Sequence, residues 1–162
     1  MRRLIWAIEG ISKITGYVSG WIVPVMMILV LYEVLMRYVV GQPAMIADEF
    51  SGYLLVIMVF LGAAFTWKEQ GHVRITALIN RLPQKISIRT RFVGLVLTLF
   101  FAFALCQAGY HFAMFSFKYG LSSATHLRTP LQIFHLTIFV GFVLLTLQII
   151  ADILKILLKQ DH

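Results

Sequence analysis

Two charged side chains in an otherwise apolar stretch are the residues best placed to do chemistry. Glu33 and Arg37 stand four residues apart, so on a helix they share one face, with the carboxylate on the favourable, N-terminal side. A carboxylate inside a membrane is costly unless it is paired, and such residues usually face protein or water. The spacing therefore predicts a structural pair or a subunit contact. The alternative is proton or ion passage through Glu33, and one acidic residue near the edge of a span makes no relay.

A second acidic group follows a short turn. The sequence Gly41-Gln42-Pro43 would let the chain fold back tightly, and Asp48 and Glu49 then open the next apolar run. There they suit the positive end of the helix dipole, and either carboxylate could reach Arg37 across the turn. We predict a polar cluster that fixes the fold or a subunit interface.

Two histidines could bind a cofactor. On the two C-terminal apolar runs, His111 and His135 each lie seven residues from an outer charge, Lys118 and Arg128 respectively. At about 1.5 Å per residue both would lie at the same depth in neighbouring helices. Such a pair could provide the axial ligands of a b-type haem. The alternative, which we prefer, is two hydrogen-bonded histidines near an interface rich in Tyr and Phe.

Nothing else in the sequence indicates catalysis. It contains no phosphate-cradling glycine loop, no H-E-x-x-H and no C-x-x-C. The one cysteine, Cys106, lies in an apolar run without a partner at zinc spacing. His72 is expected to cap backbone or touch a lipid phosphate. We therefore predict no enzyme, no cofactor and no metal site.

The elements that position these residues are membrane helices. Of the 162 residues 60% are hydrophobic and 13% are charged, against about a quarter charged in soluble domains. Charged residues bracket runs of 19, 18, 26 and 23 uncharged residues, and about 20 suffice to cross a bilayer. We predict an all-α integral membrane protein that forms one membrane domain over residues 1–162. Its four transmembrane helices are predicted at residues 16–38, 47–67, 92–117 and 130–154.

The placement of basic residues predicts the orientation. Eleven of the fourteen Lys and Arg lie at the two termini or between the second and third runs, and three lie on the other side. The positive-inside rule then places both termini in the cytoplasm, where the same charges would meet anionic phospholipids. The net charge of +7 is thus explained by orientation, and we expect no nucleic-acid partner.

Two segments outside the spans are amphipathic. Residues 2–14 fit either a helix lying in the membrane interface or an extension of the first span. Residues 73–90 place basic side chains beside an apolar stripe, which predicts an in-plane helix that Pro83 stops or kinks.

Small residues predict where helices approach closely. Gly16 and Gly20 stand four residues apart in the first span, and Gly62-Ala63-Ala64 gives the second span a smooth surface. The partner of either surface, one of the chain's own helices or a helix of another subunit, stays open.

Several short motifs resemble one known family. They are Arg37-Tyr38, Asp48-Glu49-Phe50 with Tyr53, Phe60-Leu61-Gly62-Ala63-Ala64, Gly71-His72-Val73-Arg74-Ile75 and Thr129-Pro130-Leu131. Together with the layout of four spans, a short outer turn and a basic inner connector, they resemble the small membrane subunit of TRAP (tripartite ATP-independent periplasmic) transporters. The layout is similar over most of the chain.

The resemblance implies a supporting role. In such transporters a periplasmic binding protein delivers an organic acid anion, and a large multi-span subunit carries the substrate and sodium sites. The small subunit braces the immobile scaffold of the large one. By carry-over, the positions that determine fold or interface would be Arg37, Asp48, Glu49 and His72. We add four to this predicted set: Glu33, Tyr38, Gly62 and Arg74. Sidedness alone suggests that Ser122, His126 and Arg128 dock the binding protein.

We therefore predict a non-catalytic small permease subunit of a sodium-coupled importer of organic acid anions in a bacterial inner membrane. One alternative is a haem-binding membrane anchor of a respiratory oxidoreductase, which would rest on His111 and His135. Another is a small transporter that works as a homo-oligomer, and it would require an acidic residue deeper in the membrane than Glu33.

Overall fold

The computed structural model of the chain describes residues 2–42, 44–69, 84–125 and 127–160, and most of them are helical. Four helices in this part of the chain are long and apolar enough to cross a membrane. The predicted all-α fold with four membrane spans is confirmed. The helical elements are α1 (Arg2–Leu35), the π-helix η1 (Met36–Val40), α2 (Ile46–Lys68), α4 (Gln84–Tyr119) and α5 (Gln132–Gln160).

The first helix is longer than a bilayer requires. Its apolar stretch with η1 covers 38 residues, or about 57 Å at 1.5 Å per residue, against a hydrocarbon core of about 30 Å. Residues 2–14 are the first turns of this continuous helix. Whether this segment lies in the membrane interface or extends the first span across the bilayer stays a prediction. Pro24 lies inside α1, which continues through it.

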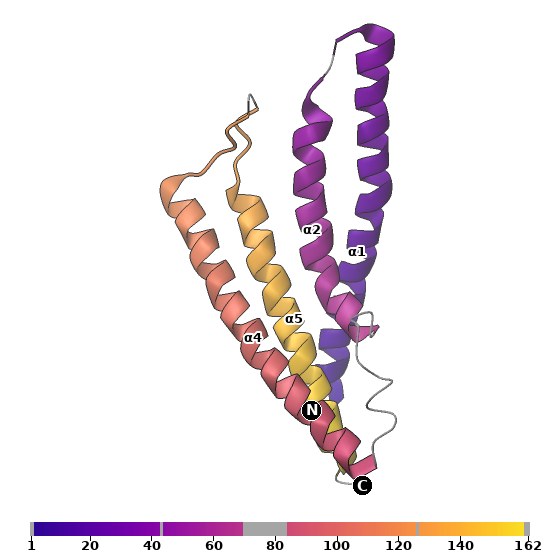
Figure 1. The fold of residues 1–162 in the computed structure, drawn as a ribbon, viewed down its shortest axis with the longest axis vertical. Helices are drawn as coiled ribbons and strands as arrows, with labels where there is room; N and C mark the ends of the chain where they lie inside the picture. The colour runs from indigo at the N-terminus through magenta and orange to yellow at the C-terminus, as the bar shows by residue number, and fades with distance from the viewer. Residues whose placement is uncertain (1, 43, 70–83, 126, 161–162) are drawn as a thin grey trace.

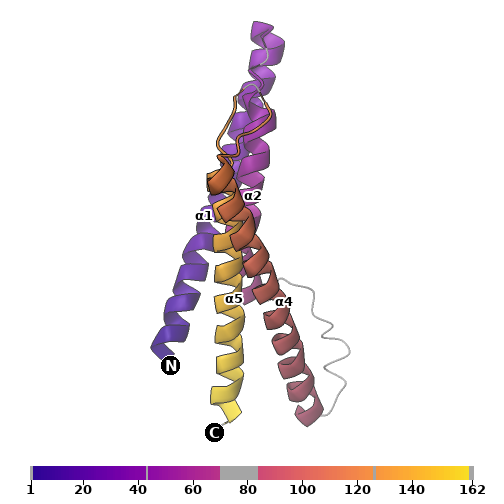
Figure 2. The ribbon, with the colours of Figure 1, turned by 90° about the vertical axis from the view of Figure 1, so that its left-hand side faces the viewer.

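The helices form one twisted layer in the order α1, α2, α5, α4, with α2 and α5 in the middle. Figure 1 shows the α1–α2 hairpin diverging from the α4–α5 hairpin toward the end opposite the chain termini. In the perpendicular view of Figure 2, α1, α5 and α4 separate toward the termini instead. We term the end with both termini the terminal end and the opposite end the turn end. Beyond the end of α2, the first turns of α1 pack on α5.

Small residues bring α1 and α2 together. A Cβ atom at Gly16 would overlap the Phe65 ring, and one at Gly62 would lie 2.9 Å from the Ser19 hydroxyl. Gly20, by contrast, has no such neighbour within 4 Å. Of the two glycines of the predicted close-packing motif, only Gly16 serves the contact within the chain.

The middle pair approaches through one glycine. A Cβ atom at Gly141 in α5 would lie 2.5 Å from the carbonyl oxygen of Phe60 in α2, so any side chain there would push the two helices apart. Toward the terminal end a small core follows, with Leu95 and Ala102 of α4 against the fully buried Ile149 of α5. The two middle helices are therefore held by direct backbone approach, and α4 is held by apolar packing.

The sequence predicted that the last helix begins at Pro130, but the helix begins two residues later. Pro130 pairs with Ser122 in an isolated bridge, and the backbone N–H of Leu131 donates to the carbonyl of Leu121 over 3.0 Å. These contacts hold the start of the segment in the loop, so α5 starts at Gln132.

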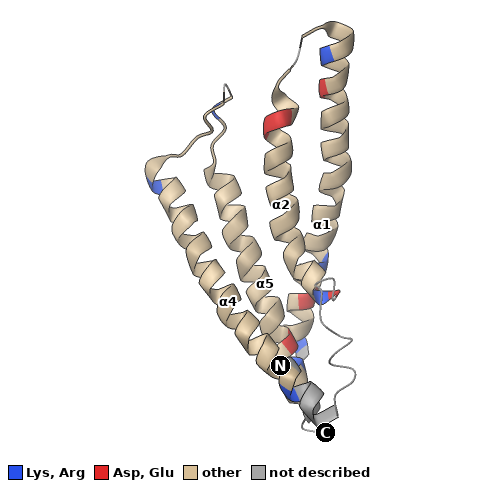
Figure 3. Ribbon diagram, in the orientation of Figure 1, with Lys and Arg blue, Asp and Glu red and all other residues tan. Residues whose placement is uncertain are grey.

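Charged residues lie near the two ends of the layer and leave its middle uncharged, as Figure 3 shows.

The sequence predicted an in-plane helix at residues 73–90. Residues 73–83 lie outside the described part of the chain, and residues 84–90 are the first turns of α4.

Candidate functional site

The predicted pair between α1 and η1 forms and also closes the adjacent turn. The Arg37 Nη2 atom lies 3.3 Å from Oε1 of Glu33, a residue only 5% exposed. The same Oε1 accepts a 3.2 Å hydrogen bond from the backbone N–H of Met45. Met45 has a φ of 55°, a left-handed conformation that is unusual for a side-chain-bearing residue. Glu33 thus fixes the entry to α2.

The two carboxylates at the start of α2 have different partners, because adjacent residues on a helix point about 100° apart. Asp48 lies 4.0 Å from Arg37, and its side chain is 81% exposed. Glu49 accepts hydrogen bonds from the Tyr53 hydroxyl, over 2.8 Å, and from the Thr125 hydroxyl. Asp48 is therefore the carboxylate that extends the Glu33–Arg37 pair. We refer to Glu33, Arg37, Met45 and Asp48 as the turn-end cluster.

Glu49 ties α2 to the loop between α4 and α5. Thr125 belongs to that loop, and its hydroxyl also lies 2.9 Å from the Ser123 hydroxyl. The Ser123 N–H in turn donates to the Thr129 carbonyl over 2.9 Å. Next to this tie, the rings of Tyr53 and Phe134 stack with centroids 4.1 Å apart. The two hairpins diverge at this end, and these contacts bridge them.

The same loop carries the residues predicted to dock a binding protein. Ser122 forms the bridge with Pro130, and Arg128 has a φ of 46° with an exposed side chain. His126 lies outside the described residues. The structure therefore places Ser122 and Arg128 in one loop at the turn end, next to the Glu49 tie.

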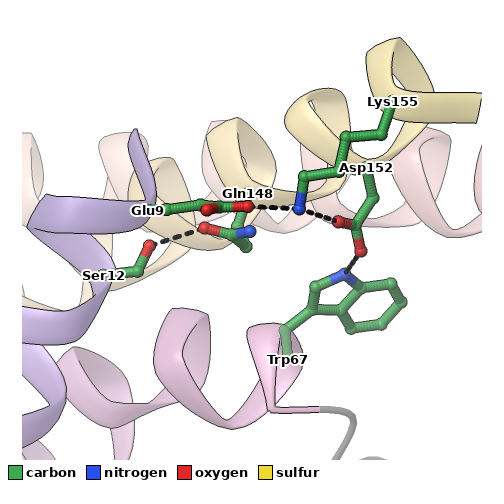
Figure 4. Close-up of polar contacts among 6 residues, drawn as sticks. All are labelled: Glu9, Ser12, Trp67, Gln148, Asp152 and Lys155. Carbon is green, nitrogen blue, oxygen red and sulfur yellow. Dashed lines mark hydrogen bonds and ion pairs between the residues drawn. The ribbon is translucent and has the colours of Figure 1, made fainter. Parts of the chain in front are cut away.

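A second polar cluster lies at the terminal end, and the sequence analysis missed it (Figure 4). The Lys155 ammonium of α5 forms ion pairs with Glu9 of α1 and, over 3.2 Å, with Asp152 one turn away. The other oxygen of Asp152 accepts a 3.1 Å hydrogen bond from the indole N–H of Trp67. Three helices, α1, α2 and α5, therefore meet around two carboxylates and one ammonium.

One neutral contact completes this cluster. The Ser12 hydroxyl donates to Oε1 of Gln148 over 2.8 Å, and both residues are almost completely buried. We refer to the six residues of Figure 4 as the terminal-end cluster: Glu9, Ser12, Trp67, Gln148, Asp152 and Lys155. Its signal in the sequence was a polar stripe at i, i+4 and i+7 on an apolar helix, Gln148, Asp152 and Lys155.

The remaining predicted positions have different surroundings. Tyr38 lies in η1 with 80% of its surface exposed, and Gly62 faces Ser19 within the chain. His72 and Arg74 lie outside the described residues. Whether these positions meet another subunit stays a prediction.

The two histidines proposed as haem ligands lie in different environments. The ring of His135 packs on Phe112, with centroids 4.1 Å apart. His111, the residue before Phe112, is exposed and lies edge-on to Tyr110. Since neighbouring positions on α4 point in different directions, the side chain that α4 presents to His135 is a phenyl ring. Within the described ranges, no group of three His, Cys, Asp or Glu is placed to hold a metal ion.

The layer leaves most of its apolar surface uncovered. In the most apolar 18-residue window of each span, only 11% to 17% of residues are buried within the chain. Large exposed side chains occur on both outer helices, among them Trp21 and Met27 of α1 and Phe100, Phe101 and Phe103 of α4. In a membrane these faces contact lipid or the helices of another protein. The geometry suits a surface that partner helices cover.

Comparison with known proteins gives a consistent result. The family model described as the DctQ component of tripartite ATP-independent periplasmic transporters matches residues 26–159. A Haemophilus influenzae protein assigned as a TRAP transporter small permease is 40% identical over 62 residues, which span 38% of this chain and 38% of that relative. The region matched by the family model contains the whole turn-end cluster, and all of the terminal-end cluster except Glu9 and Ser12.

Proposed function

The chain belongs to the DctQ components of the tripartite ATP-independent periplasmic transporters, and from this premise we propose that it is a non-catalytic scaffold that binds and braces the large permease subunit. The transporter would be a sodium-coupled importer of an organic acid anion delivered by a periplasmic binding protein. Membership in the family makes the chain a small permease subunit, a transporter component with several membrane spans. It gives no support to a haem-binding anchor.

The observation that carries the scaffold proposal is a layer one helix thick that is tied at both ends. The ion pairs at the terminal end join α1, α2 and α5, and the Glu49 tie joins α2 to the α4–α5 loop. Hydrogen bonds between helices resist sliding because, in the low-dielectric membrane, a broken bond leaves a polar group without water. A tied layer with uncovered faces suits a subunit that supports another.

The orientation follows from the same proposal. Both termini would lie in the cytoplasm, as the positive-inside rule requires. The basic residues of the terminal end would then contact anionic phospholipids of the bacterial inner membrane, and the turn end would face the periplasm. This sidedness places the α4–α5 loop where a periplasmic binding protein can reach it.

The scaffold proposal is tested by co-expressing the chain with its large permease subunit and measuring the amount that co-purifies in mild detergent. We expect a stoichiometric complex with the wild-type chain. Gly141→Ala should lower the yield of the complex at least severalfold, because a Cβ there meets the Phe60 carbonyl and separates the middle helices. The matched control is Gly94→Ala, since a Cβ at Gly94 meets nothing within 4 Å.

Two results would contradict the proposal. Absence of the large subunit from the purified wild-type chain would contradict the scaffold role. Co-purification of flavin or iron–sulfur subunits in its place would favour the haem-binding anchor, and His111 and His135 would be the residues to mutate.

Docking of the binding protein has its own test. Arg128→Asn removes the charge while keeping a residue type that tolerates a positive φ, so the loop should keep its shape. We expect the binding protein to dock about threefold to tenfold more weakly, within the range for the loss of one ordinary hydrogen bond. The His126→Ala variant tests the neighbouring position. Unchanged affinity in both variants would contradict the docking role.

A further inference from the structure

A pocket of about 430 Å³ opens between α1 and α2 at the turn end. Its volume lies in the range of about 300–1,000 Å³ that is usual for ligand sites. The polar part of its wall is formed by Glu33, Arg37, Asp48 and Ser51. Tyr38 also lines the pocket and is 80% exposed. In Figure 1 this end of the α1–α2 hairpin stands apart from α4 and α5. The pocket is therefore accessible to another protein in the membrane.

Two buried acceptors in the pocket lack partners. The hydrogen bonds that Arg37 and Met45 donate to the Glu33 carboxylate both end on Oε1, and Oε2 is buried without a hydrogen bond within the described part of the chain. The Ser51 hydroxyl is also buried and, among the same residues, has no partner. A buried polar atom left without a hydrogen bond destabilises the protein, and a charged one does so more strongly. The pocket is thus built to receive hydrogen-bond donors.

The charge of the pocket defines the donor. Two carboxylates and one guanidinium line it, which leaves one negative charge, and Arg37 already contacts Oε1 of Glu33 and lies near Asp48. A free metal ion needs about six oxygen ligands, more than this wall offers. A basic side chain needs only two or three acceptors and brings several N–H donors.

We propose that this pocket receives a Lys or Arg side chain of the large permease subunit, which donates hydrogen bonds to Oε2 of Glu33 and to the Ser51 hydroxyl. This inference rests on the proposed scaffold function, and it names the chemistry of one anchoring contact. The incoming positive charge neutralises the excess carboxylate. The hydroxyl and the carboxylate oxygen, which have no hydrogen-bond partner among the described residues, then become satisfied in the complex.

The decisive experiment compares two serines. Ser51→Ala and Ser116→Ala each delete a buried hydroxyl that has no partner among the described residues, but only Ser51 lines the pocket. Neither change should lower the unfolding midpoint of the isolated chain. In co-purification with the large permease subunit, we expect Ser51→Ala to weaken the complex about fivefold, the usual effect of one hydrogen bond, and Ser116→Ala to leave it unchanged.

Two further measurements identify the occupant. Glu33→Gln removes the charge and should weaken the complex about tenfold or more. A photoreactive benzoylphenylalanine in place of the exposed Tyr38 should cross-link to the large subunit. The cross-linked segment of the large subunit should contain the basic residue. Replacing that residue by Met should weaken the complex at least as much as Glu33→Gln, and combining this replacement with Ser51→Ala should cost less than the sum of the two separate losses.

The possible outcomes distinguish the pocket inference from the scaffold function on which it rests. If the wild-type chain co-purifies with the large subunit and Ser51→Ala and Glu33→Gln do so equally well, the pocket inference is overturned and the scaffold function stands. If the wild-type chain does not co-purify, both are overturned. If sodium chloride, compared with choline chloride, raises the unfolding midpoint of the isolated wild-type chain but not of Ser51→Ala, the occupant is a monovalent cation and the inference is wrong.

Discussion

The two ends of the helix layer both contain carboxylates in an apolar setting, but they satisfy them differently. At the terminal end the Lys155 ammonium contacts both Glu9 and Asp152, and the second oxygen of Asp152 accepts from Trp67. At the turn end both contacts to Glu33 share one oxygen. The other oxygen is buried without a partner in the described part of the chain.

At the terminal end the contacts hold the chain together, whereas at the turn end a carboxylate oxygen is left available for another protein. The terminal-end cluster joins residues far apart in sequence, such as Trp67 and Asp152, which are 85 positions apart. The turn-end contacts join positions 4 and 12 residues apart. A buried charge is tolerated where its partners are complete and costs free energy where they are missing. We expect the first arrangement to stabilise the isolated chain, and on our proposal the second gains stability on assembly.

The comparison is tested most strongly by deleting one carboxylate at each end. Asp152→Ala removes an acceptor of the Trp67 indole and one of the two carboxylates around Lys155. We expect the free energy of unfolding to fall by about 2 kcal/mol, the range for hydrogen bonds to a charged group. The shift is measured as the change in the midpoint of SDS unfolding in mixed micelles.

Asp48→Ala is the matched control at the turn end. The Asp48 side chain is 81% exposed and 4.0 Å from Arg37, and an exposed ion pair contributes about 0–1 kcal/mol. The unfolding midpoint should therefore change little. Equal losses for the two variants would mean that the carboxylates at the two ends contribute equally to the stability of the isolated chain, contrary to this expectation.

A smaller effect is expected from the neutral contact of the terminal-end cluster. Ser12→Ala leaves Oε1 of the fully buried Gln148 without its donor, and Nε2 of this amide is already unpartnered among the described residues. We expect a loss of about 1 kcal/mol, near the upper part of the range for hydrogen bonds between membrane helices.

The double variant Ser12→Ala with Gln148→Met completes the cycle. Met fills a similar volume without polar atoms, so the double variant should be more stable than Ser12→Ala alone. A double variant that is less stable than either single variant would show that the Gln148 amide has another essential contact.

Features with a local signal could be predicted from the sequence. The four spans follow from runs of uncharged residues, and the Glu33–Arg37 contact follows from a spacing of four on a helix. The short turn predicted that Asp48 or Glu49 could reach Arg37, and the structure shows Asp48 at 4.0 Å. In both contacts the interacting residues are close in sequence, so helical periodicity or a short turn determines which side chains can meet.

Features that depend on the packing of distant helices could not be predicted. The contact of Ser12 with Gln148 requires that α1 extends beyond α2 and packs on α5, and these residues are 136 positions apart. The bond from Thr125 to Glu49 requires the fold of the α4–α5 loop. The sequence shows which residues are polar in an apolar helix, but the helix order decides which of them meet.

The Glu49 tie adds a third comparison, because it is one of the contacts that bridge the diverging hairpins at the turn end. Thr125→Val removes the hydroxyl that donates to Glu49 and keeps the shape of the side chain. We expect the amide of Ser123, which bonds to Thr129, to exchange its hydrogen about fivefold faster, as expected for the loss of about 1 kcal/mol of local stability.

Thr137→Val is the matched control for this change. The Thr137 hydroxyl bonds only locally, to the carbonyl of Ile133 one turn earlier in α5, so exchange in the loop should stay the same. Equal acceleration by both variants would show that the Glu49 tie does not order the loop.

The smallest expected effect concerns the turn that Glu33 closes. Met45 adopts a φ of 55°, which costs a side-chain-bearing residue about 1–2 kcal/mol, whereas glycine adopts it freely but loses about 0.5–1 kcal/mol more chain entropy on folding. Met45→Gly keeps the backbone N–H that donates to Glu33 and should raise the free energy of unfolding by about 0.5 kcal/mol. Ala44→Gly, at a neighbouring position without a positive φ, should lower it by a similar amount. If both variants lose stability equally in SDS unfolding, the turn is not strained, and the hydrogen bond from Met45 to Glu33 does not offset a cost in the backbone.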